Sequence, residues 1–375
     1  MDAAGYNRIL DDSAGGGLLA EGKLLFERTG VQQWTFQQVE EYSNRVAHYF
    51  LAEGFSKGDT LAVFMENRPE FVCTWLGLAK IGVIPALINY DLRAESLHHS
   101  ILVAGCKAVV FSSSRSGAVS DIFTLLLNGA RQTYPTYHTG SGGNVVSVPE
   151  SKNLDELSRE QSVTPVPRKV QDSINFKDKL MFIYTSGTTG NPKGVEYEHR
   201  SQYLHTLTQC MTDSMGLTGT DTVCGIVPMF HAMGWGIPWS ALMLGCKQVM
   251  PHRFMDPARL IELMSSEKVT LSAGVPTIWQ GVKGLYEANP GAYDLSSLSR
   301  LTCGGSSPPP SLIRWFWDEL DVEMIQGWGM TETSGAACFN LPFESSRLGT
   351  IGGPIEGNEL KIDENGELLV RGPAI

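Results

Sequence analysis

The residues best suited to chemistry are concentrated in one short segment, Tyr184–Gly194. It combines hydroxyl side chains, glycines and one lysine, Lys193. These supply what a polyphosphate needs: close approach of backbone N–H groups, hydroxyl donors and a mobile cation. The segment contains no Gly-Lys-Ser or Gly-Lys-Thr, so it is not a Walker A loop. A flexible Ser/Gly linker is the alternative, but the apolar run before the segment and its Pro-Lys-Gly ending favour a phosphate-binding loop.

Two other places carry residues that could act with such a loop. Glu332 offers the hard oxygen ligand that suits Mg²⁺, and Thr331 offers a hydroxyl to a phosphoryl group. The alternative for Glu332 is a solvated carboxylate at the start of a helix. His231 lies in an apolar run with Met233 and Trp235, which suits an alkyl chain. A histidine in such a run is more often a hydrogen-bonded interior residue, and its apolar neighbours could equally be core.

Alternating strands and helices are predicted to position these residues. A capping box at Thr35–Gln38 begins one helix, Pro69 begins a second that runs to about Lys80, and a third covers Ala94–Ala104. The predicted strands are Thr60–Met65, Pro85–Asn89, Lys107–Phe111, Lys179–Tyr184, Val269–Ala273, Arg300–Cys303 and Val322–Ile325. This alternation is typical of a doubly wound parallel α/β sheet with ligand sites in the loops after the strands.

Two stretches interrupt the alternation. Residues 139–173 are polar, with Gly-Ser-Gly-Gly and three prolines, and are predicted to be mostly surface connection between two halves. From Gly349 onward, tight turns and short apolar runs predict a small antiparallel sheet.

Composition excludes several classes of protein. The 375 residues are 42% hydrophobic and 18% charged, as in ordinary globular proteins. A net charge of −11 argues against nucleic-acid binding driven by overall charge. The seven cysteines form no CxxC pair, which argues against a disulfide scaffold or zinc ribbon. Thr222–Cys246 lacks charges and is long enough to cross a bilayer, but its prolines and glycines favour a strand, a loop and a helix.

Five motifs, in order along residues 181–373, resemble those of the adenylate-forming (AMP-binding) superfamily, which includes acyl-CoA synthetases, peptide-synthetase adenylation domains and luciferases. They are the Tyr184–Gly194 loop, Pro228–His231, Gly304–Ser306, Gly327–Glu332 and Gly366–Pro373. Asn67–Lys80 resembles the fatty-acid-transport and very-long-chain acyl-CoA synthetase branch, whereas the middle of the chain resembles medium- and long-chain acyl-CoA synthetases. The resemblance implies the superfamily's large N-terminal domain, with two doubly wound sheet subdomains and a small antiparallel β subdomain.

The resemblance also implies roles for individual residues. The catalytic residues would be Lys193, Thr331 and Glu332, with Glu332 also holding Mg²⁺. ATP and AMP would be bound by Thr185, Ser186, Gly187, Thr188, Thr189, Gly190, Lys193, Gly304, Gly305, Ser306, Gly327, Trp328, Gly329 and Thr331. His231, Met233 and Trp235 would bind the substrate, and the absence of an Asp from this segment favours a fatty acid over an amino acid.

The expected domain plan has three parts. Residues 1–173 form an N-terminal α/β subdomain with a polar linker, residues 174–345 a nucleotide- and acyl-binding α/β subdomain, and residues 346–375 the start of a small β subdomain. The family's Thr-Gly-Asp segment and mobile C-terminal domain, which carries a transition-state Lys, have no counterpart in this sequence.

The expected activity is ATP-dependent conversion of a fatty carboxylate to acyl-AMP, as in an acid–thiol ligase of fatty acid metabolism. A truncated or fragmentary form of such a ligase is expected, with thioester formation impaired. A non-catalytic nucleotide- or acyl-binding remnant, with a regulatory role or no enzymatic role, is the alternative. ATP, Mg²⁺ and CoA are the expected cofactor and co-substrates. Neither nucleic-acid binding nor a transmembrane span is expected. A cytoplasmic location is expected, and oligomeric state, peripheral membrane contact and association with the endoplasmic reticulum or peroxisome are left open.

Overall fold

A computed structural model describes residues 6–10, 31–127, 134–140, 147–185, 192–252, 255–340 and 347–375. The chain divides into two compact units, an N-terminal unit that ends at His199 and a C-terminal unit formed by Arg200–Ile375 together with strand β1. The boundary predicted after residue 173 therefore moves to His199, because strands β8 and β9 belong to the sheet of the N-terminal unit.

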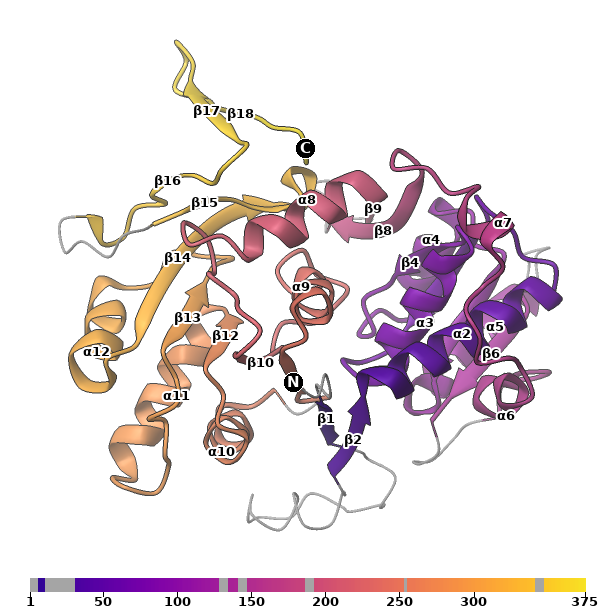
Figure 1. Ribbon diagram of the computed structural model, residues 1–375, viewed down its shortest axis with the longest axis horizontal. Helices are drawn as coiled ribbons and strands as arrows, with labels where there is room; N and C mark the ends of the chain where they lie inside the picture. Colours follow the sequence, from indigo (N-terminus) through magenta and orange to yellow (C-terminus); the bar gives the residue numbers. More distant parts are fainter. Residues whose placement is uncertain are drawn as a thin grey trace. The chain divides into compact units, whose positions relative to one another are not determined.

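The N-terminal unit alternates strands and helices as predicted (Figure 1). Its elements are β2 (Val31–Thr35), α2 (Phe36–Ala52), β3 (Thr60–Phe64), α3 (Pro69–Lys80), β4 (Ile84–Leu87), α4 (Ala94–Val103), β5 (Ala108–Ser112), η1 (Ser113–Arg115), α5 (Ser116–Leu127), β6 (Thr136–Thr139), β7 (Lys152–Asn153), α6 (Leu154–Arg159), α7 (Arg168–Gln171), β8 (Lys179–Thr185) and β9 (Lys193–Glu198). The predicted start signals are confirmed. Thr35 and Gln38 form a reciprocal capping box, and Pro69 stands at the first turn of α3.

The sheet of this unit has the strand order β7-β6-β5-β3-β4-β8-β9. All neighbours are parallel except β9, which runs antiparallel to β8. The five strands β4-β3-β5-β6-β7 are neighbours in this spatial order. When they are numbered along the chain from β3, the order is the 2-1-3-4-5 arrangement of flavodoxin-like folds. In such folds ligands bind outside the carboxyl ends of the two strands where the order reverses, here β3 and β5.

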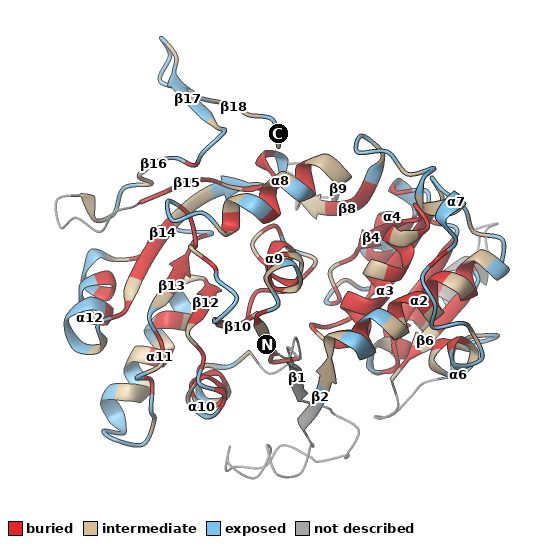
Figure 2. Ribbon diagram, viewed as in Figure 1, coloured by how far each residue is buried: buried red, intermediate tan, exposed pale blue. Residues whose placement is uncertain are grey.

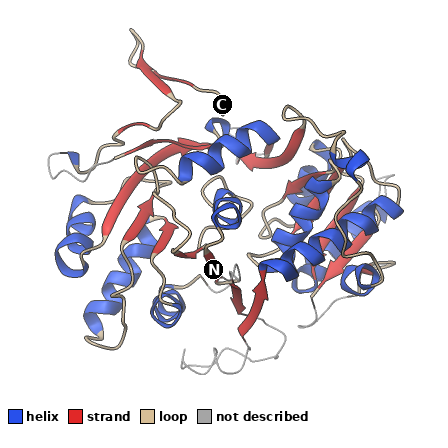
Figure 3. Ribbon diagram, in the orientation of Figure 1, coloured by secondary structure: helices blue, strands red, loops and turns tan. Residues whose placement is uncertain are grey.

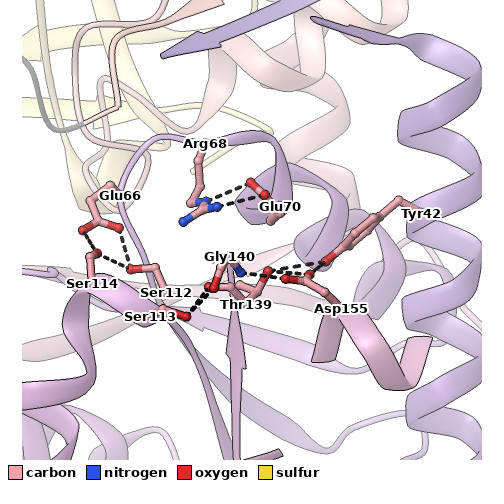
Figure 4. A network of polar contacts seen from close by, with 10 residues as sticks. All are labelled: Tyr42, Glu66, Arg68, Glu70, Ser112, Ser113, Ser114, Thr139, Gly140 and Asp155. Carbon is pink, nitrogen blue, oxygen red and sulfur yellow. Dashed lines mark hydrogen bonds and ion pairs between the residues drawn. The ribbon is translucent and has the colours of Figure 1, made fainter. Parts of the chain in front are cut away.

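That reversal point is filled by the protein's own side chains (Figure 4). The carboxylate of Glu66, just after β3, is fully buried and accepts hydrogen bonds from Ser112 Oγ and Ser114 Oγ, both at 2.6 Å. It also pairs with Arg115 Nε at 2.5 Å. Next to this group, Arg68 binds Glu70 through two hydrogen bonds of 2.8 and 2.9 Å. The reversal point of the N-terminal unit is thus a closed ionic cluster.

Residues 139–173 lie mostly at the surface, as predicted, but include short regular elements. They contain β7, α6 and α7, and Leu154 of α6 is fully buried. The Asn153 side chain caps α6 by accepting from Glu156 N. Asp155 then accepts hydrogen bonds from Tyr42 Oη at 2.5 Å and from the backbone of Gly140 at 2.7 Å. The prediction of a mostly exposed stretch is therefore confirmed, and what it did not predict is that a few of its residues, such as Leu154 and Asp155, contact the rest of the unit.

The C-terminal unit has the same type of construction. Its elements are β1 (Tyr6–Leu10), α8 (His199–Gln209), β10 (Thr222–Cys224), α9 (Gly236–Leu244), β11 (Lys247–Met250), α10 (Pro257–Glu267), β12 (Leu271–Gly274), α11 (Pro276–Ala288), β13 (Arg300–Cys303), α12 (Pro310–Leu320), β14 (Glu323–Met330), η2 (Thr331–Thr333), β15 (Gly335–Phe339), β16 (Gly353–Pro354), β17 (Glu359–Ile362) and β18 (Leu368–Arg371). The uncharged stretch Thr222–Cys246 forms β10, a loop and α9, as predicted. Among the residues that the structure describes, no helix is long and apolar enough to span a membrane.

The central strands β11-β10-β12-β13-β14 repeat the 2-1-3-4-5 order. All of these neighbours are parallel, β15 and β16 extend the sheet antiparallel beyond β14, and β1 lies parallel to β11. Helices α10, α11 and α12 lie together on one side of the strands (Figure 3). On the other face, Ile237 and Ala241 of α9 pack with Leu271, Ala273 and Ile325 in one apolar core.

Burial decreases toward the end of the chain. The central strands are mostly buried, whereas the β17–β18 hairpin is largely exposed (Figure 2). This hairpin is the small antiparallel sheet predicted from the turn signals after Gly349.

Candidate functional site

At the carboxyl ends of its central strands, the C-terminal unit contains a cavity of about 260 Å³. It is lined by His205, Thr208, Gln209, Ser214, Met215, His231, Ala232, Met233, Ala273, Thr302, Gly304, Gly305, Gly327, Trp328, Gly329, Met330, Thr331, Gly335, Ala336, Phe339 and Ile355. The strand order reverses at β10 and β12, so this is where a doubly wound sheet is expected to hold a ligand.

Eight of the predicted site residues line this cavity. They are His231, Met233, Gly304, Gly305, Gly327, Trp328, Gly329 and Thr331. They come from the segment after β10, the loop after β13, the end of β14 and the short helix η2. Strand β14 is longer than predicted and includes Gly327 to Met330, so the motif residues stand on a strand end and not on a loop.

Two glycines of the site allow approaches that a side chain would block. A Cβ atom on Gly304 would lie 2.8 Å from Met233 Cε. A Cβ atom on Gly329 would lie 1.7 Å from the carbonyl oxygen of Gly335 in the paired strand β15. The glycine at position 329 therefore lets β14 and β15 pair closely beside Thr331.

Three predicted site residues lie elsewhere in the unit. Ser306 and Glu332 are exposed and do not line the cavity, although each follows a residue that does. Trp235 is fully buried, and its ring lies 4.3 Å from that of His205, so it supports the helices around the cavity and does not face into it.

The predicted phosphate-binding loop belongs to the N-terminal unit. Ser186, Gly187, Thr188, Thr189 and Gly190 lie outside the described residues. Thr185 ends β8, and Lys193 begins β9 and is exposed. The two residues are paired across the antiparallel β8–β9 ladder, which joins the two ends of the loop.

His231 is one of two histidines that line the cavity. Partial burial lowers the pKa of His231 below its ordinary value. Its Nδ1 atom accepts a hydrogen bond of 3.3 Å from the backbone N–H of Met233. Since Nδ1 accepts, Nε2 carries the hydrogen and can donate to an acceptor in the cavity.

Sequence reasoning missed a second histidine, His205. It comes from α8, is 5% exposed and lines the cavity. Its Nε2 atom accepts a hydrogen bond of 2.9 Å from the Gln209 side chain, whose oxygen accepts one of 2.6 Å from Ser240 Oγ. The imidazole ring also forms a hydrogen bond with the backbone of Ser334, the residue directly after η2. His205 thus ties α8 to the turn that carries Thr331, a long-range contact that no local pattern marks.

A family comparison identifies the chain. A family model described as AMP-binding enzyme matches residues 21–375. The chain belongs to the AMP-binding enzyme family. The resemblance inferred from the five motifs is therefore confirmed.

Relatives within the AMP-binding family include fatty-acid ligases. A medium-chain-fatty-acid–CoA ligase of Ectopseudomonas oleovorans is 44% identical over 307 residues, covering 82% of this chain and 55% of the relative. A long-chain-fatty-acid–CoA ligase of Thermus thermophilus is 31% identical over 320 residues, covering 83% and 54%. The chain spans about half the length of these curated relatives.

Solved structures show the same fold. A long-chain-fatty-acid–CoA ligase from Archaeoglobus fulgidus aligns with a TM-score of 0.77 at 23% identity, covering 99% of this chain and 72% of that one. The anthranilate CoA ligase AuaEII, crystallised with anthranoyl-AMP, aligns with a TM-score of 0.79 at 23% identity, covering 91% and 65%. The expected adenylate-forming fold, with two large sheets and a small antiparallel one, is therefore correct.

In this AMP-binding enzyme we expect His205 to make stability depend on pH. Burial lowers the pKa of His205 to about 4, whereas an unfolded histidine titrates near 6.5. Between these values the unfolded state binds more protons, so the free energy of unfolding should fall by roughly 3 kcal/mol as the pH drops from about 6.5 to 4. Urea unfolding of the wild type and His205→Gln at several pH values tests this. The variant should lack this part of the pH dependence, and parallel curves for the two proteins would contradict the assignment.

Proposed function

We propose that the protein joins a fatty carboxylate to AMP, as an acyl-CoA ligase of the AMP-forming type does. A carboxylate oxygen attacks the α-phosphorus of Mg·ATP and pyrophosphate leaves. The thiol of CoA then attacks the acyl carbonyl carbon of the acyl-AMP, and AMP leaves. The observation that carries the proposal is that the glycines of two nucleotide motifs, Thr331 and His231 all line one cavity. The fatty-acid ligases among the relatives support it.

The nucleotide end of the proposed site is formed by backbone and hydroxyl groups. Gly304 and Gly305 line the cavity with main-chain atoms, next to the flexible side chain of Met233, and the ring of Trp328 offers a stacking surface for a base. Thr331 can donate its hydroxyl to the α-phosphate. The motif resemblance, and not the cavity, assigns Lys193 to the pyrophosphate; this residue is exposed at the start of β9 in the N-terminal unit.

Glu332 fits the role of Mg²⁺ ligand. Mg²⁺ keeps several water molecules and is held by one or two carboxylates plus substrate phosphates. Glu332 is an exposed carboxylate next to the cavity-lining Thr331. In the part of the chain that the structure describes, no cluster of three metal-binding side chains forms a protein-only cage. Bound there, Mg²⁺ would neutralise phosphate charge.

The acyl end of the proposed site suits an alkyl chain. Met215, Ala273, Phe339 and Ile355 give this part of the cavity apolar walls. His231 Nε2–H can donate to the substrate carboxylate, so we assign it to binding and not to proton transfer.

Pyrophosphate release tests the proposal. The purified chain is incubated with Mg·ATP and saturated fatty acids of graded length, and a Lys193→Ala, Glu332→Ala double variant gives the blank. We expect release above the blank with a maximum at a medium chain length. ATP binding without release at any chain length would contradict the enzymatic proposal and favour a nucleotide-binding protein without ligase activity.

A further inference from the structure

Helix α4 of the N-terminal unit holds both ends of the predicted phosphate-binding motif, Tyr184–Gly194. At the first end, Tyr184 Oη donates a hydrogen bond of 2.7 Å to the backbone carbonyl of Ser100. Near the second end, the Nε2 atom of His99 lies 3.1 Å from the backbone carbonyl oxygen of Pro192. His99 and Ser100 are neighbours in α4, so a single turn of one helix fixes two separate positions of the motif.

The hydrogen bond of His99 fixes the peptide that precedes Lys193. A carbonyl oxygen only accepts, so His99 Nε2 carries a hydrogen and donates it. Both groups are partly buried, where water competes less for the bond. The carbonyl of Pro192 and the backbone nitrogen of Lys193 belong to the same planar peptide. A side chain that holds this carbonyl therefore also holds the backbone of the lysine.

The position of β9 in the sheet explains why such support matters. Among the described strands of its sheet, β9 stands at the edge and has β8 as its neighbour. Lys193 is the first residue of β9 and pairs with Thr185, the last residue of β8. The ladder thus holds Lys193 from one side, and His99 holds the peptide in front of it. Together they set the point from which a flexible four-carbon side chain leaves the strand.

We propose that His99 is a positioning residue for phosphate binding, which holds the Pro192–Lys193 peptide so that the Lys193 ammonium meets the β- and γ-phosphates of ATP. The proposal rests on the function proposed above, in which Lys193 serves the pyrophosphate. Loss of one neutral hydrogen bond that positions a charged group is expected to lower the affinity for these phosphates about tenfold. A nucleotide that lacks them should bind as before.

Nucleotide binding tests this without turnover. Calorimetry in the presence of Mg²⁺ compares α,β-methylene-ATP, which cannot release pyrophosphate, with AMP, which lacks the β- and γ-phosphates. His99→Ala should weaken the binding of α,β-methylene-ATP about tenfold and leave the binding of AMP unchanged. His99→Gln keeps a side-chain N–H donor and should recover most of the lost affinity.

A double variant separates positioning from a general effect on the fold. If His99 acts through Lys193, then adding His99→Ala to Lys193→Ala should change the affinity for α,β-methylene-ATP less than about twofold. A tenfold loss that persists in the Lys193→Ala protein would overturn the proposal. Equal affinities of the wild type and His99→Ala for α,β-methylene-ATP would overturn it as well.

His48→Ala is the matched control. His48 of α2 forms the same type of contact in the same unit, with Nε2 at 3.0 Å from the backbone carbonyl oxygen of Thr164. This variant should bind both nucleotides as the wild type does, and a loss equal to that of His99→Ala would overturn the proposal. If the wild type releases no pyrophosphate but these differences in binding are found, the ligase function fails and the role of His99 stands. Failure of the wild type to bind α,β-methylene-ATP would overturn both.

Discussion

Glu332→Ala is expected to lower the rate of pyrophosphate release by about 10²–10³-fold. Removal of one group that stabilises developing charge in a reaction typically costs about 3–4 kcal/mol, and a carboxylate that positions Mg²⁺ on the triphosphate acts in this way. Glu332 directly follows the cavity-lining Thr331 in η2 and is exposed, so its removal should leave the packing of the fold intact.

The metal dependence distinguishes this role from a structural one. The Glu332→Ala rate should partly recover at high Mg²⁺ concentration, and Glu332→Asp should retain more activity than Glu332→Ala. Glu364→Ala is the control, because Glu364 is an equally exposed carboxylate in the turn between β17 and β18. If the rate of pyrophosphate release by Glu332→Ala depends on Mg²⁺ with the same midpoint and the same maximum as in the wild type, Glu332 does not bind the metal.

Glu66→Ala should destabilise the N-terminal unit strongly, by about 3–5 kcal/mol. Glu66 is fully buried and accepts from two serines as well as pairing with Arg115, whose side chain is 15% exposed. Removing one partner of a buried ion pair leaves the other charge without compensation, which costs far more than the intact pair contributes. Arg115 also lies 4.8 Å from the ring centre of Tyr90, a contact that cannot replace the lost carboxylate.

Urea unfolding of the N-terminal unit measures this effect. The double variant Glu66→Leu, Arg115→Leu should be less destabilised than Glu66→Ala, because neither charge is then left unpaired. Glu287→Ala, which breaks a partly exposed helix pair with Lys283, should cost less than about 0.5 kcal/mol. A cost for Glu66→Ala as small as that of Glu287→Ala would show that the ion pair contributes little to the fold.

The two reversal points show what the strand order alone leaves undecided. Both units have the 2-1-3-4-5 order, which favours a ligand site at the same relative place in each. In the N-terminal unit this place is closed by Glu66, Arg115 and two serines. In the C-terminal unit it is lined by glycines and by uncharged side chains, several of them large, and contains a cavity. The strand order is the same in both units, so the residues after the strands decide which unit forms a cavity.

The sequence by itself determined the elements and the family. Capping at Thr35, the proline that opens α3 and the apolar runs of the strands are local signals, because helix and strand periodicity acts over a few neighbouring residues. The glycine-rich motifs could also be identified from the sequence, because a close approach to the backbone requires glycine at fixed positions.

Only the tertiary structure decided how the motif residues are used. It placed Trp235 in the interior and brought His205 and Ser214 to the cavity wall from the helix and loop before β10. It also buried part of α6 in a stretch whose composition predicted a surface connection. These outcomes depend on which helix face packs against which sheet and on how distant polar groups pair, and such contacts join residues whose relation no local pattern records.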